Sequence, residues 1–396
     1  MAKKYPKVRS RNGLHTYRYD ITDPQTGERI QKETPSFPTA KEAYYAGIKI
    51  EEEIRNGTYI EESKITVSEW SQKFLVIYAS TGKVKNRTVD IRSDSLKIIN
   101  RKIGGLILFE VTLLIYQTML NELKEEGYSK NSLIIIHSAG CLMFRKAVAM
   151  KVIKNDPTKG AEIPAFQETV EDIENNSELP QYLEKEQLAL LLRTAKESGS
   201  VQGFNALFLL AYTGMRIGEL CALKISDIDE INKKISVTKT LYQRHGISSF
   251  GLNTPKSKSS IRKIDVSETV IKILKNQEIW RNRFKMSRRD EYYNGAEFVF
   301  INELLLPGWP AAGRTIEVFM KEILEAAGLP TALTPHSLRH TYTSLMAEAG
   351  VELPAIKKLL GHKKDGGITE AVYLHVTESK KRAAVEKLDQ LMDGLL

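Results

Sequence analysis

Two histidines and an arginine lie within five residues of one another in "LTPHSLRHTYTSLMAEAG", at His336, Arg339 and His340. Thr334 is a suitable N-cap, and Pro335 a suitable first residue, for a helix that begins here. We expect the three polar side chains to share an exposed side of this helix, because its packing requires none of them.

A metal site and a DNA-reading helix-turn-helix are two possible uses of this region. His336 and His340 lie one helical turn apart, but the glutamate of the zinc-protease pattern is absent, and Arg339 between them would repel a cation. The helical patterns on either side of "AGVELP" resemble a helix-turn-helix, yet the second, "AIKKLLG", offers mainly two lysines to read bases. We therefore disfavour both.

Further cations occur in two other stretches. In "TGMRIGELC", Arg216 lies on the opening turn of a helical pattern, and Glu219 could orient it from one turn away. The polar loop "NTPKSKSSIRKI" leads into a strand-like run and carries Lys256, Lys258 and Arg262. These cations suit contact with phosphate, although a hairpin that is merely soluble is equally plausible.

Together with a tyrosine, these side chains suit attack on a phosphodiester. Arginine guanidiniums stay charged and can bind two non-bridging oxygens through paired hydrogen bonds. Histidines can donate further hydrogen bonds as charge develops in the transition state. A tyrosine with a pKa of about 10 becomes a nucleophile when nearby cations stabilise its phenolate, and a lysine can protonate the departing sugar oxygen.

The order of the motifs "TGMRIGEL", "TPKSKSS", "HSLRHT", "LLGH" and "VYLHV" resembles the catalytic domain of the tyrosine recombinases, the phage and transposon integrase family. The resemblance covers residues 180–388. It implies that Tyr373 is the nucleophile and forms a 3′-phosphotyrosyl bond. It also implies that the scissile phosphate is held and activated by Arg216, His336, Arg339 and His362.

The resemblance further implies that a lysine of the hairpin is the general acid; Lys256 is our choice and Lys258 the alternative. His340 would support the site rather than act on DNA. The family needs neither a metal nor a nucleotide cofactor, because the phosphotyrosyl bond retains the energy for rejoining the strand. The segment "HKKDGGITEAVY" is a residue or two longer than the usual family pattern, so we expect Tyr373 to be mobile until a partner orders it.

The sequence predicts a multidomain, mainly α-helical chain. Residues 1–58 predict a small α+β domain with a three-stranded sheet and one helix, and residues 65–165 predict a helical domain. These two resemble the arm-binding and core-binding domains of transposon-type integrases. Residues 166–182 predict a linker. Residues 183–396 predict a mixed, mainly α catalytic domain with a small antiparallel sheet and a C-terminal tail helix.

The N-terminal domain begins with a basic flank interleaved with tyrosines, which could dock on DNA. A solvated tail before a small accessory fold is the alternative. Cations of this flank and of the hairpin are our predicted DNA-binding residues. They are Lys3, Lys4, Lys7, Arg9, Arg11, Arg18, Lys258 and Arg262.

Composition narrows the class of protein. The formal net charge of +9 favours an anionic partner such as nucleic acid. No run approaches the roughly 18 apolar residues of a membrane span, and the N-terminus lacks the apolar stretch of a signal peptide. Cys141 and Cys221 are isolated thiols and predict no disulfide framework. We expect a cytoplasmic, nucleoid-associated protein.

We therefore predict a site-specific DNA recombinase, the integrase and excisionase of a mobile element. It would act on double-stranded attachment-site DNA as a homotetramer that exchanges C-terminal tail helices between protomers. DNA-bending and directionality proteins are further possible partners. Two alternatives stay open: a DNA-binding regulator without catalysis, and a type IB-like topoisomerase with the same tyrosine chemistry.

Overall fold

The computed structural model describes residues 5–22, 27–60, 64–82, 84–166, 182–243, 249–255, 258–361, 367 and 369–376. The predicted site residues Lys3, Lys4, Lys256 and His362 lie outside these residues, as do the predicted tail helix and the side chain of Lys258. The chain divides into two compact units, Met1–Gln167 and Glu168–Leu396. Both combine helices with small antiparallel sheets.

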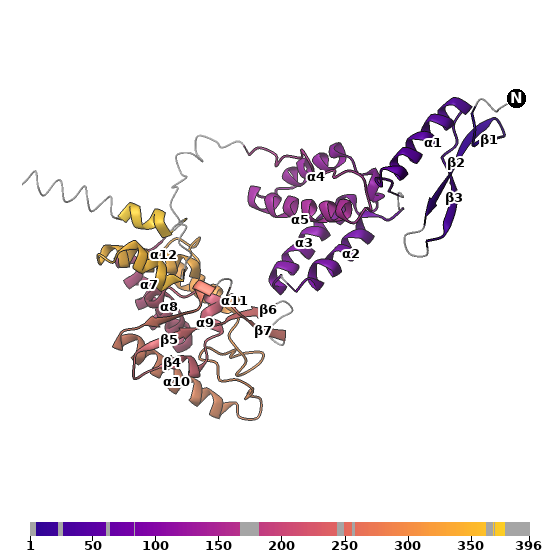
Figure 1. Ribbon diagram of the computed structural model, residues 1–396. Coiled ribbons are helices and arrows are strands. Elements are labelled where there is room, and N and C mark those ends of the chain that lie inside the picture. Colours follow the sequence, from indigo (N-terminus) through magenta and orange to yellow (C-terminus); the bar gives the residue numbers. More distant parts are fainter. Residues whose placement is uncertain are drawn as a thin grey trace, which may run out of the picture. The chain divides into compact units, whose positions relative to one another are not determined.

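The first unit begins with a three-stranded antiparallel sheet packed against one helix (Figure 1). Tyr17 is buried against Gly47 of that helix. Because side chains alternate along a strand, Arg9, Arg11 and Arg18 share the opposite face of the sheet. The elements are β1 (Val8–Arg11), β2 (Leu14–Thr22), β3 (Arg29–Glu33) and α1 (Ala40–Arg55).

A helical bundle completes the first unit. Its helices are α2 (Val67–Ser80), α3 (Asn86–Ile103), α4 (Leu113–Glu125) and α5 (Lys130–Ala149). Thr66 caps α2 and forms a capping box with Glu69. Ser129 caps α5 through its side chain alone. By length and composition alone α5 is apolar enough to cross a membrane. Its buried side chains belong to the core of this bundle, however, and that packing accounts for its apolar character.

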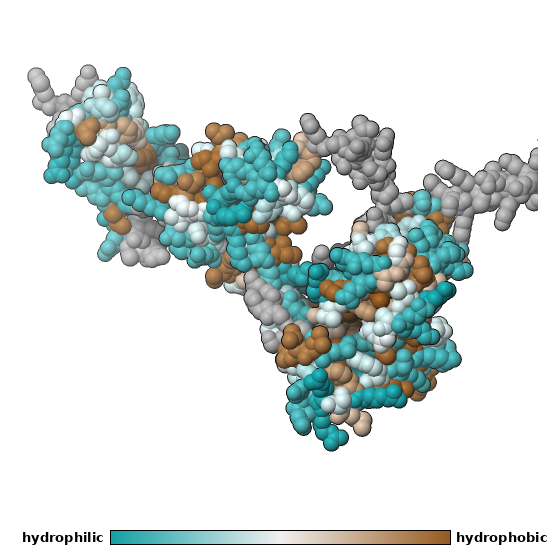
Figure 2. Space-filling model, turned by 180° about the vertical axis from the view of Figure 1, so that it is seen from behind, coloured by the Kyte–Doolittle hydropathy of each residue, from teal (hydrophilic) through white to brown (hydrophobic). Residues whose placement is uncertain are grey.

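In the second unit, the apolar helix α8 (Val201–Thr213) lies between other helices and packs against α7, α10, α11 and α12 (Figure 1). Those helices are α7 (Lys185–Glu197), α10 (Glu268–Ser287), α11 (Gly313–Ala326) and α12 (Pro335–Glu348), and the short helices are α9 (Ile217–Cys221) and α13 (Leu353–Leu360). On the face seen in Figure 2, hydrophobic residues form small groups among hydrophilic ones.

Two small antiparallel sheets lie beside these helices. One has the strand order β4-β5-β8, and the other pairs β6 with β7. The strands are β4 (Ile228–Asp229), β5 (Lys234–Val237), β6 (Thr240–Gln243), β7 (Phe250–Asn253) and β8 (Arg262–Asp265). The strand-like run that was predicted after the lysine-bearing loop therefore forms a strand, β8.

Helix α12 begins at Pro335 with Thr334 as N-cap, as predicted, but its polar residues do not share an exposed side. His336 is exposed, whereas Arg339, His340 and Thr343 are buried. The expectation of one solvent-facing side was wrong because α12 contacts α8, α11 and α13 and is covered on several sides. Arg339 and His340 are therefore part of the interior.

Gly214 ends α8 and turns the chain toward Arg216. Its φ of +60° lies in the left-handed region, and a Cβ built there would lie 2.7 Å from both Leu360 Cδ2 and Tyr342 Cδ1. Glycine is therefore required both by the backbone conformation and by the two side chains that approach it.

Gly214→Ala should lower the free energy of unfolding of the second unit by about 2 kcal/mol or more, because it adds left-handed strain to overpacking. Gly251→Ala is the matched control, since the nearest atom to its new Cβ lies at 3.7 Å. In a Trp70→Phe background only Trp280 and Trp309 remain, so urea unfolding followed by tryptophan fluorescence reports on the second unit. Equal midpoints for the two variants would contradict this account of Gly214.

Candidate active site

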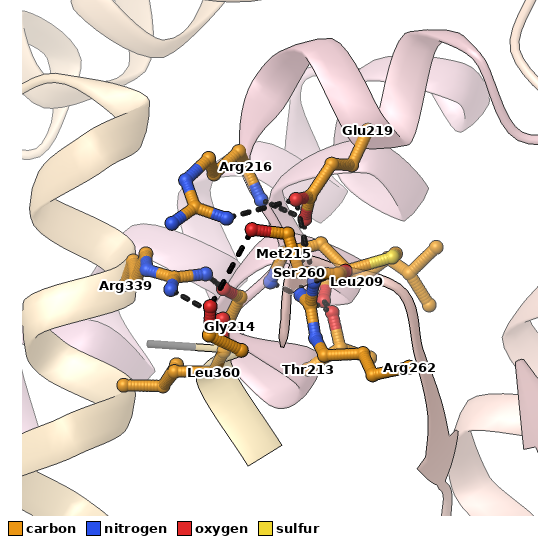
Figure 3. Close-up of polar contacts among 11 residues, drawn as sticks. Leu209, Thr213, Gly214, Met215, Arg216, Glu219, Ser260, Arg262, Arg339 and Leu360 are labelled. Carbon is orange, nitrogen blue, oxygen red and sulfur yellow. Dashed lines mark hydrogen bonds and ion pairs between the residues drawn. The ribbon is translucent and has the colours of Figure 1, made fainter. Parts of the chain in front are cut away.

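Arg216 is held by a carboxylate one turn along its own helix. It is the N-cap residue of α9, where its backbone N–H donates to Glu219 Oε2 at 3.0 Å. Its guanidinium Nη1 donates to Glu219 Oε1 at 2.9 Å (Figure 3). The Arg216 side chain is 37% exposed, whereas that of Glu219 is only 3% exposed. The predicted pair is thus confirmed, and it leaves part of the guanidinium accessible.

A second arginine occupies the other side of the same carboxylate. Arg262 Nη2 donates to Glu219 Oε2 at 2.9 Å and Nη1 donates to Oε1 at 3.3 Å. Burial would raise the pKa of Glu219, but hydrogen bonds and charge from Arg262, and then from Arg216, outweigh it and hold that pKa below its ordinary value. Glu219 is therefore ionised at neutral pH.

The structure corrects the prediction that Arg262 lies on an exposed hairpin and contacts DNA. Its side chain is only 5% exposed and faces Glu219. The physical reason is strand alternation: Arg262 shares the inward face of β8 with Ile264, which is buried in the core, while Ile261 and Lys263 face outward. In this position the Arg262 guanidinium faces Glu219 and is turned away from solvent.

Arg339 reaches the same cluster from α12. Only 2% of this residue is exposed. Its Nη1 donates to the Gly214 carbonyl and its Nη2 to the Leu360 carbonyl, each at 2.6 Å (Figure 3). Burial, followed by the charge of Arg216, lowers the pKa of Arg339 to about 9. The group remains charged at neutral pH and joins α12 to the ends of α8 and α13.

The two histidines of α12 lie beside these arginines. The His336 and His340 rings are in edge-to-face contact, with centroids 4.8 Å apart. Although His336 is exposed, partial desolvation of its ring, followed by the charges of Arg339 and Arg216, lowers its pKa. Burial, followed by His336 and Arg339, lowers the pKa of His340 to about 4. The exposed His336 can reach a ligand, whereas the buried His340 packs against the His336 ring.

Tyr373 lies in the helical residues 369–376, which pack against other residues of the second unit. Val372 is fully buried, and the Tyr373 ring packs against the small hydrophobic cluster that includes Tyr342 and Leu360. An ion pair of 3.0 Å from Lys357 Nζ to a carboxylate oxygen of Glu370 links the Tyr373 segment to α13.

Tyr342 is the other tyrosine near the arginines. It is buried, and burial raises its pKa even though Arg262 and Arg339 oppose that shift. A buried phenol that resists ionisation is a poor nucleophile. Tyr373, which is only partly buried, is the better candidate.

The cluster is chemically an anion site. Arg216, Arg262 and Arg339 contribute three positive charges and Glu219 one negative charge, so this group carries a net charge of +2. With His336 exposed beside it, the group offers charge and hydrogen-bond donors to a phosphate. Its outermost members, Arg216 and Arg339, lie more than 100 residues apart in the chain, and the fold brings them together.

Four of the predicted DNA-binding residues, Lys7, Arg9, Arg11 and Arg18, are described in the first unit. Lys7 Nζ is 2.5 Å from a Glu51 carboxylate oxygen, and Arg18 Nε donates to Glu33 at 2.7 Å. Arg9 and Arg11 are exposed on the outer face of the sheet, as Lys7 is exposed at its edge. The exposed members can meet an external anion.

Comparison with known proteins places the chain among recombinases. Residues 181–380 match the sequence model described as the phage integrase family. The integrase of Staphylococcus phage L54a is 30% identical over 87% of this chain and 98% of its own length. A XerC-like tyrosine recombinase of Caldanaerobacter subterraneus subsp. tengcongensis is 29% identical over 99% of this chain and its full length.

A solved structure also shares the fold. The Tn1549 transposon integrase in complex with circular-intermediate DNA superposes with a TM-score of 0.62 at 24% identity, covering 82% of this chain and 99% of that one.

The lowered pKa values of the two histidines predict that the stability of the second unit depends on pH. The folded pKa of His340 is about 4, below the roughly 6.5 of an unfolded histidine, so the unfolded state binds the proton first as pH falls. The contribution of His340 to the free energy of unfolding of the second unit should be fully present above pH 6.5 and should be lost as the pH falls toward 4. His336 shifts in the same direction.

His340→Gln should flatten this slope, whatever it does to stability at pH 8. Urea midpoints measured by tryptophan fluorescence in the Trp70→Phe background between pH 8 and 4 test it. His15→Gln, in the first unit, is the control and should keep the original slope. A His340→Gln slope as steep as that of the parent would show that the proton is taken up elsewhere.

Proposed function

The chain belongs to the phage integrase family and is a tyrosine-type site-specific DNA recombinase; we propose that Tyr373 is its nucleophile and that Arg216, His336 and Arg339 hold the scissile phosphate. One observation carries this assignment. Arg339 of α12 donates to the carbonyl of Leu360, a member of the hydrophobic cluster against which the Tyr373 ring packs, and Arg216 at the start of α9 lies close enough for its charge to lower the pKa of Arg339.

In the proposed reaction, the exposed part of Arg216 and the His336 ring bind the non-bridging oxygens, and Arg339 adds charge from beneath. The Tyr373 oxygen attacks phosphorus and loses its proton to solvent water. A P–O bond forms to the tyrosine while the bond to the 5′ oxygen breaks, leaving a 3′-phosphotyrosyl bond. Lys256, or Lys258, protonates the departing 5′ oxygen, and His362 assists at the phosphate. Attack by another 5′ hydroxyl reverses these steps.

The number of DNA strands that are broken determines the number of protomers in the assembly. Exchange between two duplexes breaks four strands, and each protomer supplies one Tyr373, so four protomers are required. We assign the exposed arginines of the N-terminal sheet to a second DNA contact and the tail helix to contacts between protomers. DNA-bending and directionality proteins would then act on the DNA that this assembly holds in the cytoplasm.

Covalent chemistry separates this proposal from a regulator. Wild type and Tyr373→Phe are incubated in EDTA with an attachment-site duplex that carries a nick, and products are separated on a denaturing gel. Wild type should give a covalent adduct whose peptide maps to Tyr373, and the variant should give none. Tyr342→Phe, a matched loss of one hydroxyl, should keep the adduct. Wild type that binds the site without an adduct would support the regulator.

A topoisomerase would also form the adduct, because it uses the same tyrosine chemistry. It would relax supercoiled DNA without requiring a second attachment site. Joining of two labelled duplexes into recombinant products separates the two enzymes, and relaxation without such products would favour the topoisomerase.

Arg216→Lys should bind the duplex like wild type but form the adduct about 100-fold or more slowly, because a point charge cannot replace the planar pair of donors. Gel shift and single-turnover adduct formation measure the two steps separately. Arg283→Lys, at an exposed position on α10, is the control and should change neither. An unchanged adduct rate in Arg216→Lys would remove Arg216 from the site.

A further inference from the structure

Arg262 holds together the elements that carry the active-site residues. Resting on the recombinase function proposed above, we propose that Arg262 is a positioning residue for strand cleavage. It aligns Arg216, the lysine-bearing loop and the end of α13 without touching DNA. This role differs from that of an arginine that contacts DNA and from that of an arginine that only stabilises the fold.

Its first effect acts on Arg216 through Glu219. The two arginines share one carboxylate, and the buried one, Arg262, donates to both carboxylate oxygens. A buried carboxylate with a single cationic partner holds that partner tightly, since neither charge is compensated elsewhere. Arg262 supplies most of the compensation, so Arg216 remains able to share its guanidinium with a phosphate.

Its second effect acts on the loop that precedes β8. Arg262 Nη1 donates to the Ser260 carbonyl at 3.2 Å. Buried Ser260 in turn places its Oγ 3.5 Å from the Gly361 carbonyl, at the end of α13. The short 3-10 turn Lys258–Ser260 is thereby fixed against both β8 and α13. This turn begins two residues after Lys256.

Gly361 shows how closely these segments approach. It has a φ of +68°, and a Cβ built on it would lie 2.9 Å from the Ser259 carbonyl oxygen and 3.2 Å from Arg262 Cδ. The end of α13 therefore rests directly on the start of β8. His362, the next residue, is one that the family resemblance assigns to the phosphate.

The contacts form a closed circuit. Leu360, the neighbour of Gly361, accepts a hydrogen bond from Arg339, which also donates to the Gly214 carbonyl two residues before Arg216 (Figure 3). Four segments thus determine one another's positions, and Arg262 is the side chain that joins two of them. In order, the circuit runs through Arg216, Glu219, Arg262, Ser260, Gly361, Leu360, Arg339 and Gly214.

The chain offers a matched control for a merely structural arginine. Arg281 on α10 also has a side chain that is 5% exposed and donates to a backbone carbonyl, that of Phe298, at 3.2 Å. Arg262 and Arg281 are thus equally buried, but only Arg262 contacts Glu219. Replacing either removes a buried guanidinium from the second unit.

The test uses the full chain and the nicked attachment-site duplex at saturating protein. Gel shift gives the affinity, single-turnover adduct formation gives the rate, and tryptophan fluorescence gives the fraction folded. Arg262→Met should bind like wild type and form the adduct about 100-fold more slowly, the loss expected for a displacement of about 1 Å at the reacting groups. Arg262→Lys should recover part of the rate.

A double variant separates positioning from structure. In Arg262→Met, the Glu219 carboxylate competes with the phosphate for Arg216. Adding Glu219→Gln removes that competition, so the double variant should form the adduct about tenfold faster than Arg262→Met alone. A structural role predicts the opposite, because a second buried partner has been lost. Arg281→Met should lower the unfolding midpoint while its folded fraction keeps the wild-type rate.

Three results would overturn the positioning role. One is a wild-type rate in folded Arg262→Met. Another is a loss of DNA affinity in that variant equal to its loss of rate, which would make Arg262 a binding residue. The third is a double variant slower than Arg262→Met. If wild type itself forms no adduct, the recombinase function fails and the role of Arg262 fails with it, an outcome that is distinct from the other three.

Discussion

The buried carboxylate of Glu219 is the interaction on which the rest of this site depends. Three guanidiniums, from Arg216, Arg262 and Arg339, lie within one another's electrostatic influence. Taking cations out of water is costly unless an anion or hydrogen-bond acceptors replace the lost hydration. Glu219 supplies the anion for two of them, and backbone carbonyls supply acceptors for the third. Without that carboxylate, the elements that carry these arginines would repel one another where they now pack.

The same balance prepares the site for an anion. One carboxylate does not neutralise three cations, and burial, followed by the remaining repulsion from Arg216, lowers the pKa of Arg339. In the proposed reaction, a phosphate would relieve that repulsion at the partly exposed guanidinium of Arg216, and the positive charge that attracts it is in place before DNA binds. The negative charge that develops at the phosphate in the transition state meets a field that is already in place. Because the groups are held by backbone and carboxylate contacts, little reorganisation is required at the moment of reaction.

The sequence shows the elements of this site better than their environment. Thr334 and Pro335 predict the start of α12, and Glu219 lies where a partner for Arg216 belongs. The burial of Arg339 was not predictable. Helix periodicity shows which residues share a side of the helix, but it does not show how many sides neighbouring elements cover. Its partner carbonyl at Gly214 lies 125 residues away, a contact that local pattern cannot indicate. Arg262 is different: its alternation with a buried isoleucine along β8 contained the signal that it faces inward.

Leu360 connects the proposed phosphate-binding groups to the proposed nucleophile. Its carbonyl accepts from Arg339, while its buried side chain belongs to the cluster against which the Tyr373 ring packs. The same side chain would meet a Cβ at Gly214, so it also contacts the turn that leads to Arg216. A displacement of the end of α13 therefore changes the arginines and the tyrosine together. Close packing makes such a displacement costly, and this cost would keep the proposed nucleophile and the proposed phosphate site in register across segments that are distant in the chain.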